Sequence, residues 1–167
     1  KAIKAFEKMG VSGEVVVADN GSTDGSPEIA EAAGARVVHE SRPGYGSAYL
    51  AGFAAAQGKY VVMGDADDTY DFSKIDEFVE KLDEGYEMVI GNRMDSIQPG
   101  AMPWLHQYVG NPVLTRVLNI FFRSGVRDAH CGMRAFRRDA LDRLKLRTPG
   151  MEFASEMVIR ASKEKLD

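Results

Sequence analysis

The chain has 167 residues, of which 44% are hydrophobic and 28% charged, and its net charge is −4 at pH 7. This composition is typical of one soluble globular domain, and the acidic balance gives no electrostatic case for nucleic acid as a partner. The single cysteine, Cys131, excludes an internal disulfide and a multi-cysteine zinc site and favours a reducing compartment. No apolar run approaches the roughly 20 residues that a membrane span requires, and there is no signal peptide. Because the sequence begins at Lys1, without an initiator methionine, we expect an internal fragment.

Helix and strand signals alternate through the first half of the chain. Apolar spacing, proline and glycine signals predict helices over residues 1–9, 27–34, 47–57 and from a Ser73 cap, with Asp76 in a capping box, to about Gly85. Apolar and β-branched runs predict strands over residues 14–18, 36–39, 59–64 and 87–90. Near-continuous apolar strands that alternate with helices predict a parallel sheet with helices on both faces, and ligands bind beyond the carboxyl ends of such strands.

The loop after the first predicted strand begins with Asp19 in a polar, glycine-containing run. Asp19 could accept hydrogen bonds from a nucleobase at the sheet edge, or it could instead form an Asx turn that caps the next helix. After the second strand, Arg42 precedes Gly44 and Gly46 at a helix start, an arrangement suited to a diphosphate. A lone Gly-x-Gly is a weak signal, however, and no P-loop is present.

The third predicted strand runs directly into Asp65-Ala66-Asp67. Side chains alternate faces along extended backbone, so Asp65 and Asp67 are predicted to point the same way. Two carboxylates held together repel unless a cation lies between them, and Mg²⁺ or Mn²⁺ takes oxygen ligands that a bound diphosphate would complete. The alternative is an ordinary turn and helix cap.

After residue 95 the alternating pattern gives way to a proline-containing loop and an aromatic, apolar segment over residues 104–122. Apolar residues within it at helical spacing are Val113, Val117, Ile120 and Phe121. One interpretation is a core-facing helix. The other is a surface for a lipid or a partner, on which Trp104, Tyr108, Phe121 and Phe122 with Arg116 and Arg123 would suit an interface.

The last constellation of polar residues covers positions 128–136. Arg134 is a fixed cation that could bind a phosphate through two parallel hydrogen bonds, and Asp128 could orient Arg134 or accept a proton. His130 and Cys131 are too few for a zinc site, and Cys131 is expected to be a small packed residue.

Five segments occur in an order that resembles family-two glycosyltransferases of the GT-A fold, in the branch of dolichyl- or polyprenyl-phosphate sugar synthases. They are VADNGSTDG at 17–25, GYGSA at 44–48, DAD at 65–67, GNR at 91–93 and CGMRAF at 131–136. The resemblance covers nearly the whole chain and implies a Rossmann-like, mostly parallel sheet with helices on both faces.

The resemblance also implies roles for individual residues. Asp19 would contact the base, Arg42 with Gly44 the nucleotide or diphosphate, and Asp65 the nucleotide sugar beside the metal. Asp67 would be the main ligand of Mg²⁺ or Mn²⁺, and Arg93 and Arg134 would face the lipid phosphate. Asp67, Asp128 and Arg134 are therefore the catalytic candidates.

Two departures from the family pattern concern the ends of the chain. The family's first strand, which lies inside the sheet, is expected before Lys1, and the membrane helices that some members carry after the catalytic domain are not visible here. We therefore expect residues 1–167 to be a single catalytic domain that lacks this strand.

The expected reaction transfers a hexose from UDP-glucose or GDP-mannose to a polyprenyl phosphate with inversion at the anomeric carbon, at the cytoplasmic face of a membrane. A phosphate with a pKa near ~6 is already an anionic nucleophile, whereas a sugar hydroxyl would need a base such as Asp128 or Glu152. Alternatives are a saccharide-acceptor transferase, a sugar nucleotidyltransferase and a binding module without activity. The oligomeric state stays open.

Overall fold

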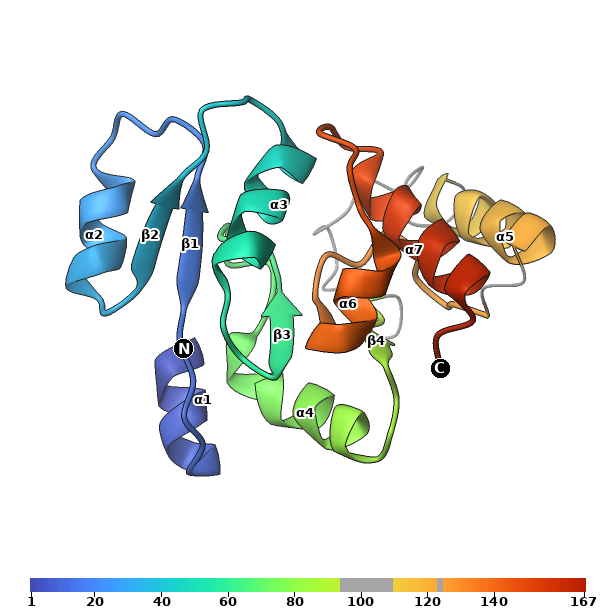
Figure 1. The fold of residues 1–167 in the computed structure, drawn as a ribbon, viewed down its shortest axis with the longest axis horizontal. Coiled ribbons are helices and arrows are strands. Elements are labelled where there is room, and N and C mark those ends of the chain that lie inside the picture. Colours follow the sequence, from blue (N-terminus) through green and yellow to red (C-terminus); the bar gives the residue numbers. More distant parts are fainter. Residues whose placement is uncertain (94–109, 123–124) are drawn as a thin grey trace.

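The computed structural model describes residues 1–93, 110–122 and 125–167 (Figure 1). The helices are α1 (Ala2–Met9), α2 (Ser26–Ala32), α3 (Tyr45–Ala55), α4 (Ile75–Asp83), α5 (Asn111–Phe122), α6 (Arg138–Leu144) and α7 (Phe153–Glu164), with a 3-10 helix η1 (Phe72–Lys74). The strands are β1 (Val16–Asp19), β2 (Arg36–His39), β3 (Tyr60–Met63), β4 (Met88–Ile90) and β5 (Arg134–Arg137). Each predicted helix and strand up to β4 is present close to its expected bounds, which confirms the α/β fold.

The strands form two sheets in the described part of the chain. β1 pairs with β2 in parallel, and β5 lies between β3 and β4 and is antiparallel to both. β3 and β4 therefore run parallel to each other, as the alternating pattern predicts. β5 is the addition that the pattern did not predict, because an arginine stands at each end of this short strand and only Ala135 and Phe136 are apolar.

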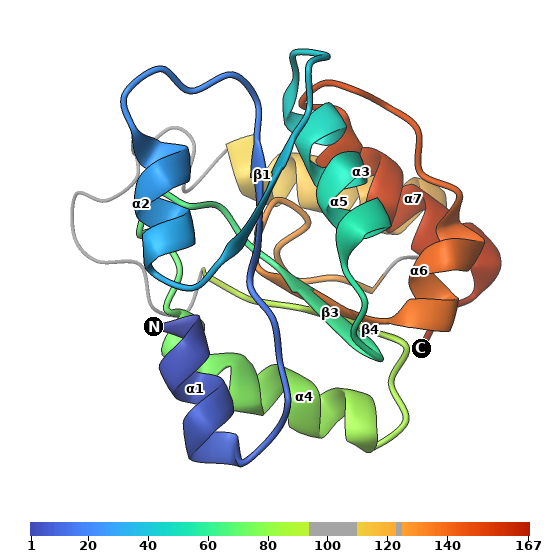
Figure 2. The ribbon, with the colours of Figure 1, turned by 60° about the vertical axis from the view of Figure 1, so that its left-hand side comes forward.

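Helices cover both faces of the sheet formed by β3, β5 and β4 (Figure 2). On one face Val61, Met63 and Phe136 pack with the apolar side chains of α3, α6 and α7. On the other face Val62 and Met133 pack with α1 and α4, which lie below the strands in Figure 2. The alternation of Val61, Val62 and Met63 between the two clusters follows from the two-residue period of a strand.

The segment between β3 and α4 corrects one sequence prediction. The Asp71 carboxylate accepts hydrogen bonds from the Ser73 amide (3.1 Å) and from the Ser73 hydroxyl (2.7 Å) and so caps η1. Ser73 is therefore not the helix cap, and Asp76 makes no capping box with it, since Asp76 accepts from the Glu77 amide and from Lys8. An anionic carboxylate is the stronger acceptor for amides at a helix start.

α5 packs against the rest of the molecule by one side only. Leu118 and Phe122 contact Ala129 and Val158, while the apolar side chains at Val113, Leu114, Val117, Ile120 and Phe121 are between 42% and 75% exposed. The helix is confirmed, but the core-facing interpretation of these residues is wrong. The predicted roles of Trp104, Tyr108 and Arg123 lie outside the described residues. Within the described residues, no helix combines the length and apolar character needed to cross a bilayer.

Candidate active site

The candidate site lies where the strands end. Asp19 is the last residue of β1, Asp65 follows β3 after one intervening residue, and Arg93 follows β4 after two. β1, β2 and β3 point the same way in Figure 1, so their carboxyl ends lie at the same end of the molecule. The convergence of polar side chains at this edge is therefore a property of the fold, as expected for an open α/β sheet.

Asp19 is held by its own loop. It is 9% exposed, and its carboxylate accepts hydrogen bonds from the amides of Gly21 (3.2 Å) and Ser22 (3.1 Å) and lies 3.2 Å from His39 Nδ1. The Ser22 side chain, with these groups, lowers the pKa of Asp19 to about 2. The contacts are those of an Asx turn, but Asp19 does not cap α2, whose N-cap is Gly25 without a side-chain hydrogen bond. A role of Asp19 in base recognition stays a prediction.

Asn20 connects this loop to the next one. Its side chain donates to the carbonyls of Glu40 (2.7 Å) and Arg42 (2.9 Å) and accepts from the Gly44 amide (2.8 Å). Arg42 Nε in turn donates to the buried Ser47 hydroxyl at 3.0 Å. The exposed Arg42 is thereby held beside the first turn of α3, the position at which a diphosphate was predicted.

Gly44 and Gly46 are explained by a close approach of protein backbone. A Cβ on Gly44 would lie 2.3 Å from the Pro149 carbonyl oxygen, and one on Gly46 would lie 2.1 Å from the Thr148 oxygen. The Gly44 amide donates to Asn20, and the Ser47 amide donates to the Pro149 carbonyl. These glycines therefore let residues 148–149 reach the start of α3, and the expected contact of Gly44 with a nucleotide stays a prediction.

Asp65 is joined to α3. The Tyr49 hydroxyl donates to Asp65 Oδ1 at 2.6 Å. Burial of Tyr49, together with the adjacent Asp65 carboxylate, raises the pKa of the phenol, so Tyr49 stays a neutral donor. On the other side of Asp65, a Cβ on Gly132 would lie 2.7 Å from Oδ2 and 2.9 Å from the Tyr70 hydroxyl. Asp65 thus lies between α3 and the segment that leads into β5.

Asp67 is exposed and accepts a hydrogen bond from the Thr69 amide at 3.0 Å. The side chain and amide of Thr69 hold the pKa of the Asp67 carboxyl below its ordinary value, so it is ionised at neutral pH. Asp65 and Asp67 supply carboxylate oxygens, the donor type that Mg²⁺ and Mn²⁺ prefer. The backbone bends at residues 66–68, so the common orientation of the two side chains, which assumed an extended backbone, stays a prediction. These residues fit a divalent ion whose remaining ligands come from a bound phosphate group.

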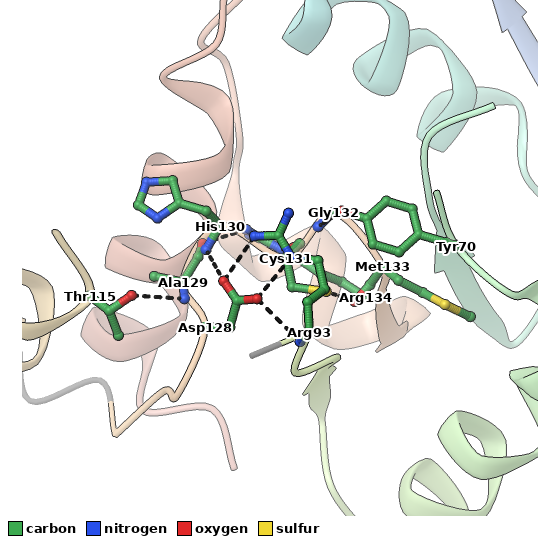
Figure 3. Close-up of polar contacts among 10 residues, drawn as sticks. All are labelled: Tyr70, Arg93, Thr115, Asp128, Ala129, His130, Cys131, Gly132, Met133 and Arg134. Atoms are coloured by element: carbon green, nitrogen blue, oxygen red, sulfur yellow. Dashed lines mark hydrogen bonds and ion pairs between the residues drawn. The ribbon is translucent and has the colours of Figure 1, made fainter. Parts of the chain in front are cut away.

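Arg93 is paired with Asp128 (Figure 3). Arg93 Nε and Nη2 donate to the two carboxylate oxygens of Asp128 at 2.9 and 3.0 Å, and the Asp128 side chain is fully buried. Burial opposes ionisation of Asp128, but the hydrogen bonds and charge of Arg93 outweigh it and lower the pKa. Asp128 therefore orients Arg93, which corrects the prediction that it orients Arg134, and it is poorly suited to accept a proton.

Arg134 is fully buried, and within the described residues its guanidinium donates to three backbone carbonyls. The acceptors are Cys131 O (2.9 Å), Ala129 O (2.8 Å) and Ala154 O (2.9 Å). Arg134 therefore fastens residues 129–131 to the first turn of α7. This placement does not fit the predicted contact with an acceptor phosphate, because a guanidinium enclosed by protein carbonyls is not presented to a ligand.

Two neighbours of Arg134 complete the segment. The Cys131 thiol is buried beside the Met133 carbonyl, and burial raises its pKa, so Cys131 is packed as predicted. Nδ1 of His130 is buried and makes no hydrogen bond within the described residues. Figure 3 shows that the His130 ring points away from the Arg93–Asp128 pair.

The sequence interpretation missed several residues that shape the site. Asn20, Tyr49 and Tyr70 reach across to other segments, and Tyr70 accepts a hydrogen bond from the Gly132 amide at 2.7 Å. Thr115 and Asn119 of α5 bind the backbone of Ala129 and Val126, which flank Asp128. Their partners lie in other segments, so only the apolar spacing of α3 and the polar residues within α5, of which Thr115 is buried, gave any signal.

Comparison with known proteins gives one family. The model of the family described as "Glycosyl transferase family 2" matches residues 12–145. The chain is 48% identical over 165 residues to the low-salt glycan biosynthesis hexosyltransferase Agl6 of Haloferax volcanii, covering 98% of this chain and 40% of that protein. It is 38% identical over 149 residues to a dolichyl-phosphate hexose transferase of the same organism, covering 88% of this chain and 63% of that protein.

A similar solved structure is glucosyl-3-phosphoglycerate synthase from Mycobacterium tuberculosis, in complex with Mn²⁺, UDP-glucose and phosphoglyceric acid. The TM-score is 0.70 at 25% identity, and the match covers 97% of this chain and 59% of that one. The chain thus spans less than two thirds of the length of these relatives.

Proposed function

We propose, from the premise that the chain belongs to glycosyl transferase family 2, that it transfers a hexose from a nucleotide diphosphate sugar to a polyprenyl phosphate with inversion. The observation that carries this proposal is that Asp65, Asp67 and Arg93 follow the carboxyl ends of β3 and β4, which run parallel to each other. Gly132 lies against the Asp65 carboxylate, and Arg93 is paired with Asp128. Carboxylates on one side suit a metal-bound diphosphate, and a guanidinium on the other suits an anionic acceptor.

The donor side would bind the nucleotide diphosphate. Asp67 would be the main ligand of Mn²⁺ or Mg²⁺ and Asp65 would support the ion and the nucleotide. A bound divalent ion neutralises charge that develops on the leaving diphosphate. Arg42, held beside α3 by Ser47, would contribute a second positive charge to the same group. UDP-glucose is the proposed donor, with GDP-mannose as the second choice, since the similar synthase was solved with UDP-glucose and Mn²⁺.

The acceptor side would bind the lipid phosphate through Arg93. Arg93 uses Nε and Nη2 in its pair with Asp128, which fixes the plane of the guanidinium. The Arg93 side chain is 23% exposed. A guanidinium held in one plane matches two phosphate oxygens better than a flexible ammonium does. Arg134 is left out of this role because its guanidinium is enclosed.

The absence of a suitable base at Asp128 favours a phosphate acceptor. Asp128 is buried, paired and low in pKa, so it would not take a proton from a sugar hydroxyl. A phosphate oxygen is largely ionised at neutral pH and attacks without a base. The second candidate, transfer to a saccharide hydroxyl, now depends on Glu152, which is exposed and accepts a hydrogen bond from the Gly150 amide.

The exposed apolar side of α5 fits a lipid acceptor. Thr115 and Asn119 of α5 bind the loop that contains Asp128, so this surface and Arg93 belong to one connected unit. Arg116, exposed on the same helix, could meet anionic headgroups. We propose that α5 rests on the membrane surface, at its cytoplasmic face, and that this brings the lipid phosphate to Arg93.

The test is transfer of radiolabelled sugar. The protein is incubated with Mn²⁺ and labelled UDP-glucose or GDP-mannose, in the presence of vesicles that contain polyprenyl phosphate or with soluble saccharides. We expect label in the lipid fraction, with an inverted anomeric linkage by NMR. Label only in a soluble saccharide would favour the second candidate, and failure to bind any nucleotide sugar with Mn²⁺ would reject both.

A further inference from the structure

A hydrogen bond between Tyr49 and Asp65 joins two segments at the candidate site. Tyr49 belongs to α3 and Asp65 to the loop after β3, and their side chains meet at 2.6 Å in a hydrogen bond from a phenol to a carboxylate. Bonds of this type are short and strong because the acceptor is charged. Asp65 therefore has one oxygen fixed by the protein before any ligand arrives.

The Tyr49 ring is itself held by aromatic neighbours. It stacks on Phe153 with ring centroids 5.9 Å apart and an angle of 3° between the planes, and it meets Tyr45 edge-on at 4.8 Å. Phe53 lies 6.0 Å away on the same helix. Since Phe153 is fully buried at the start of α7, the Tyr49 hydroxyl has one position relative to β3.

The other oxygen of Asp65 is confined as well. Oδ2 lies so close to Gly132 that any side chain there would collide with it. The Asp65 carboxylate is thus fixed on one side by α3 and on the other by the segment that leads to β5.

A neutral donor is well suited to this position. Two ionised carboxylates two residues apart repel each other, and free rotation would let Asp65 turn away from Asp67. A lysine or arginine at position 49 would hold Asp65 but would also compete with a divalent ion for its charge. A phenol orients the carboxylate without neutralising it, so less reorganisation is needed when the ion and a diphosphate bind.

We propose that Tyr49 is a positioning residue for donor binding, which acts by fixing the Asp65 carboxylate for a metal-bound nucleoside diphosphate. The inference rests on the proposed function, since it requires that Asp65 and Asp67 bind such a ligand. It assigns Tyr49 no contact with the ligand. The effect of Tyr49 must therefore pass through Asp65.

The test measures UDP affinity in the presence of Mn²⁺ by calorimetry. Tyr49→Phe keeps the stacked ring and removes the hydroxyl, so we expect affinity to fall roughly tenfold, as for loss of a hydrogen bond to a charged group. The melting temperature, followed by circular dichroism, should change by no more than a few degrees. The matched control is Tyr60→Phe, which removes an exposed phenol–carboxylate bond to Asp83 at the opposite end of β3 and should leave affinity unchanged.

A double-variant cycle separates positioning from other roles. Asp65→Ala removes the carboxylate, and Tyr49→Phe added to it should lower Mn²⁺–UDP affinity no further. A further tenfold loss in the double variant would mean that Tyr49 acts without Asp65 and would overturn the inference. Unchanged affinity in Tyr49→Phe alone would also overturn it while leaving the proposed function intact. If the unmodified protein binds neither UDP nor GDP in the presence of Mn²⁺, the proposed function itself fails.

Discussion

The two sides of the candidate site treat charge in opposite ways. On one side, Asp65 accepts from the hydroxyl of Tyr49 and Asp67 from the Thr69 amide, so their negative charge is oriented but not neutralised. On the other side, Arg93 is matched by the Asp128 carboxylate, whereas Arg134 is buried and donates to neutral backbone carbonyls. A carboxylate without a cationic partner at a strand edge suits a cationic ligand, whereas an arginine whose donors are enclosed by the protein serves the structure. Arg93 lies between these cases, because it is paired with Asp128 and its side chain is partly exposed.

Asp67→Ala tests the side of the site that carries the carboxylates of Asp65 and Asp67, and it should have the largest effect. Because Asp67 is exposed and its removal relieves repulsion, we expect the fold to be retained while Mn²⁺-dependent UDP affinity falls at least roughly a hundredfold. Calorimetry with and without EDTA measures the difference. Asp68→Ala, at the adjacent exposed carboxylate, is the control and should bind normally. Undiminished Mn²⁺–UDP binding in Asp67→Ala would remove this residue from the metal site.

Arg134→Lys tests the side of the site that carries the arginines, on which Arg134 is enclosed by backbone carbonyls. An ammonium cannot reach three carbonyls with one geometry, so we expect a loss of about 2–4 kcal/mol of stability, or roughly 5–15 °C in melting temperature. Mn²⁺–UDP affinity below the melting range should match that of the unmodified protein. A stable variant with selectively weaker affinity for polyprenyl phosphate would instead return Arg134 to the acceptor site.

Phe121→Ser tests the exposed apolar side of α5. Phe121 is 75% exposed, so the melting temperature should stay within about 2 °C, while cosedimentation with anionic vesicles should fall several-fold. Ile29→Ser, at a 70% exposed residue of α2, is the matched control for loss of an isolated apolar side chain. Equal vesicle binding by both variants and the unmodified protein would count against α5 as the membrane contact.

The smallest effect is expected from pH at Asp19. Its pKa is lowered to about 2 in the folded chain, so the stability that this carboxylate contributes is present above its ordinary pKa and is lost as pH falls through about 2. Asp19→Asn should therefore be less stable than the unmodified protein near neutrality, with the difference shrinking between about pH 4 and pH 2. Melting curves at several pH values measure this, and a constant difference would show that the charge is not involved.

Local signals in the sequence predicted the elements well. Apolar periodicity and glycine stops placed each helix and strand from α1 to β4, and the strand-end rule placed Asp19, Asp65 and Arg93 at one edge. What failed depended on contacts between distant segments. Arg134 could bind a phosphate by its chemistry, but in the structure it is enclosed by the carbonyls of residues 129, 131 and 154. Nothing within residues 131–136 of the sequence indicates this enclosure.

The glycines show the same limit. The prediction of a diphosphate loop at Gly44 and Gly46 rests on small residues before a helix, and it stays a prediction. Their lack of a side chain is also required by Thr148 and Pro149, about a hundred residues later, which the local sequence does not indicate. The cap at the start of η1 is Asp71 and not Ser73. Several polar residues lie close together in this part of the sequence, and only the folded backbone determines which of them reaches the free amides.

The tight contact at Gly44 and Gly46 sets a rule for engineering this chain. Since the backbone of residues 148–149 touches the start of α3, and Phe153 stacks on Tyr49 a few residues later, segments 44–49 and 148–153 form one module despite their separation in sequence. A chimera that exchanges only one of them with a relative of different sugar specificity would bring mismatched surfaces together. Exchanging both at once keeps the contacting surfaces matched and is therefore the design expected to retain folding.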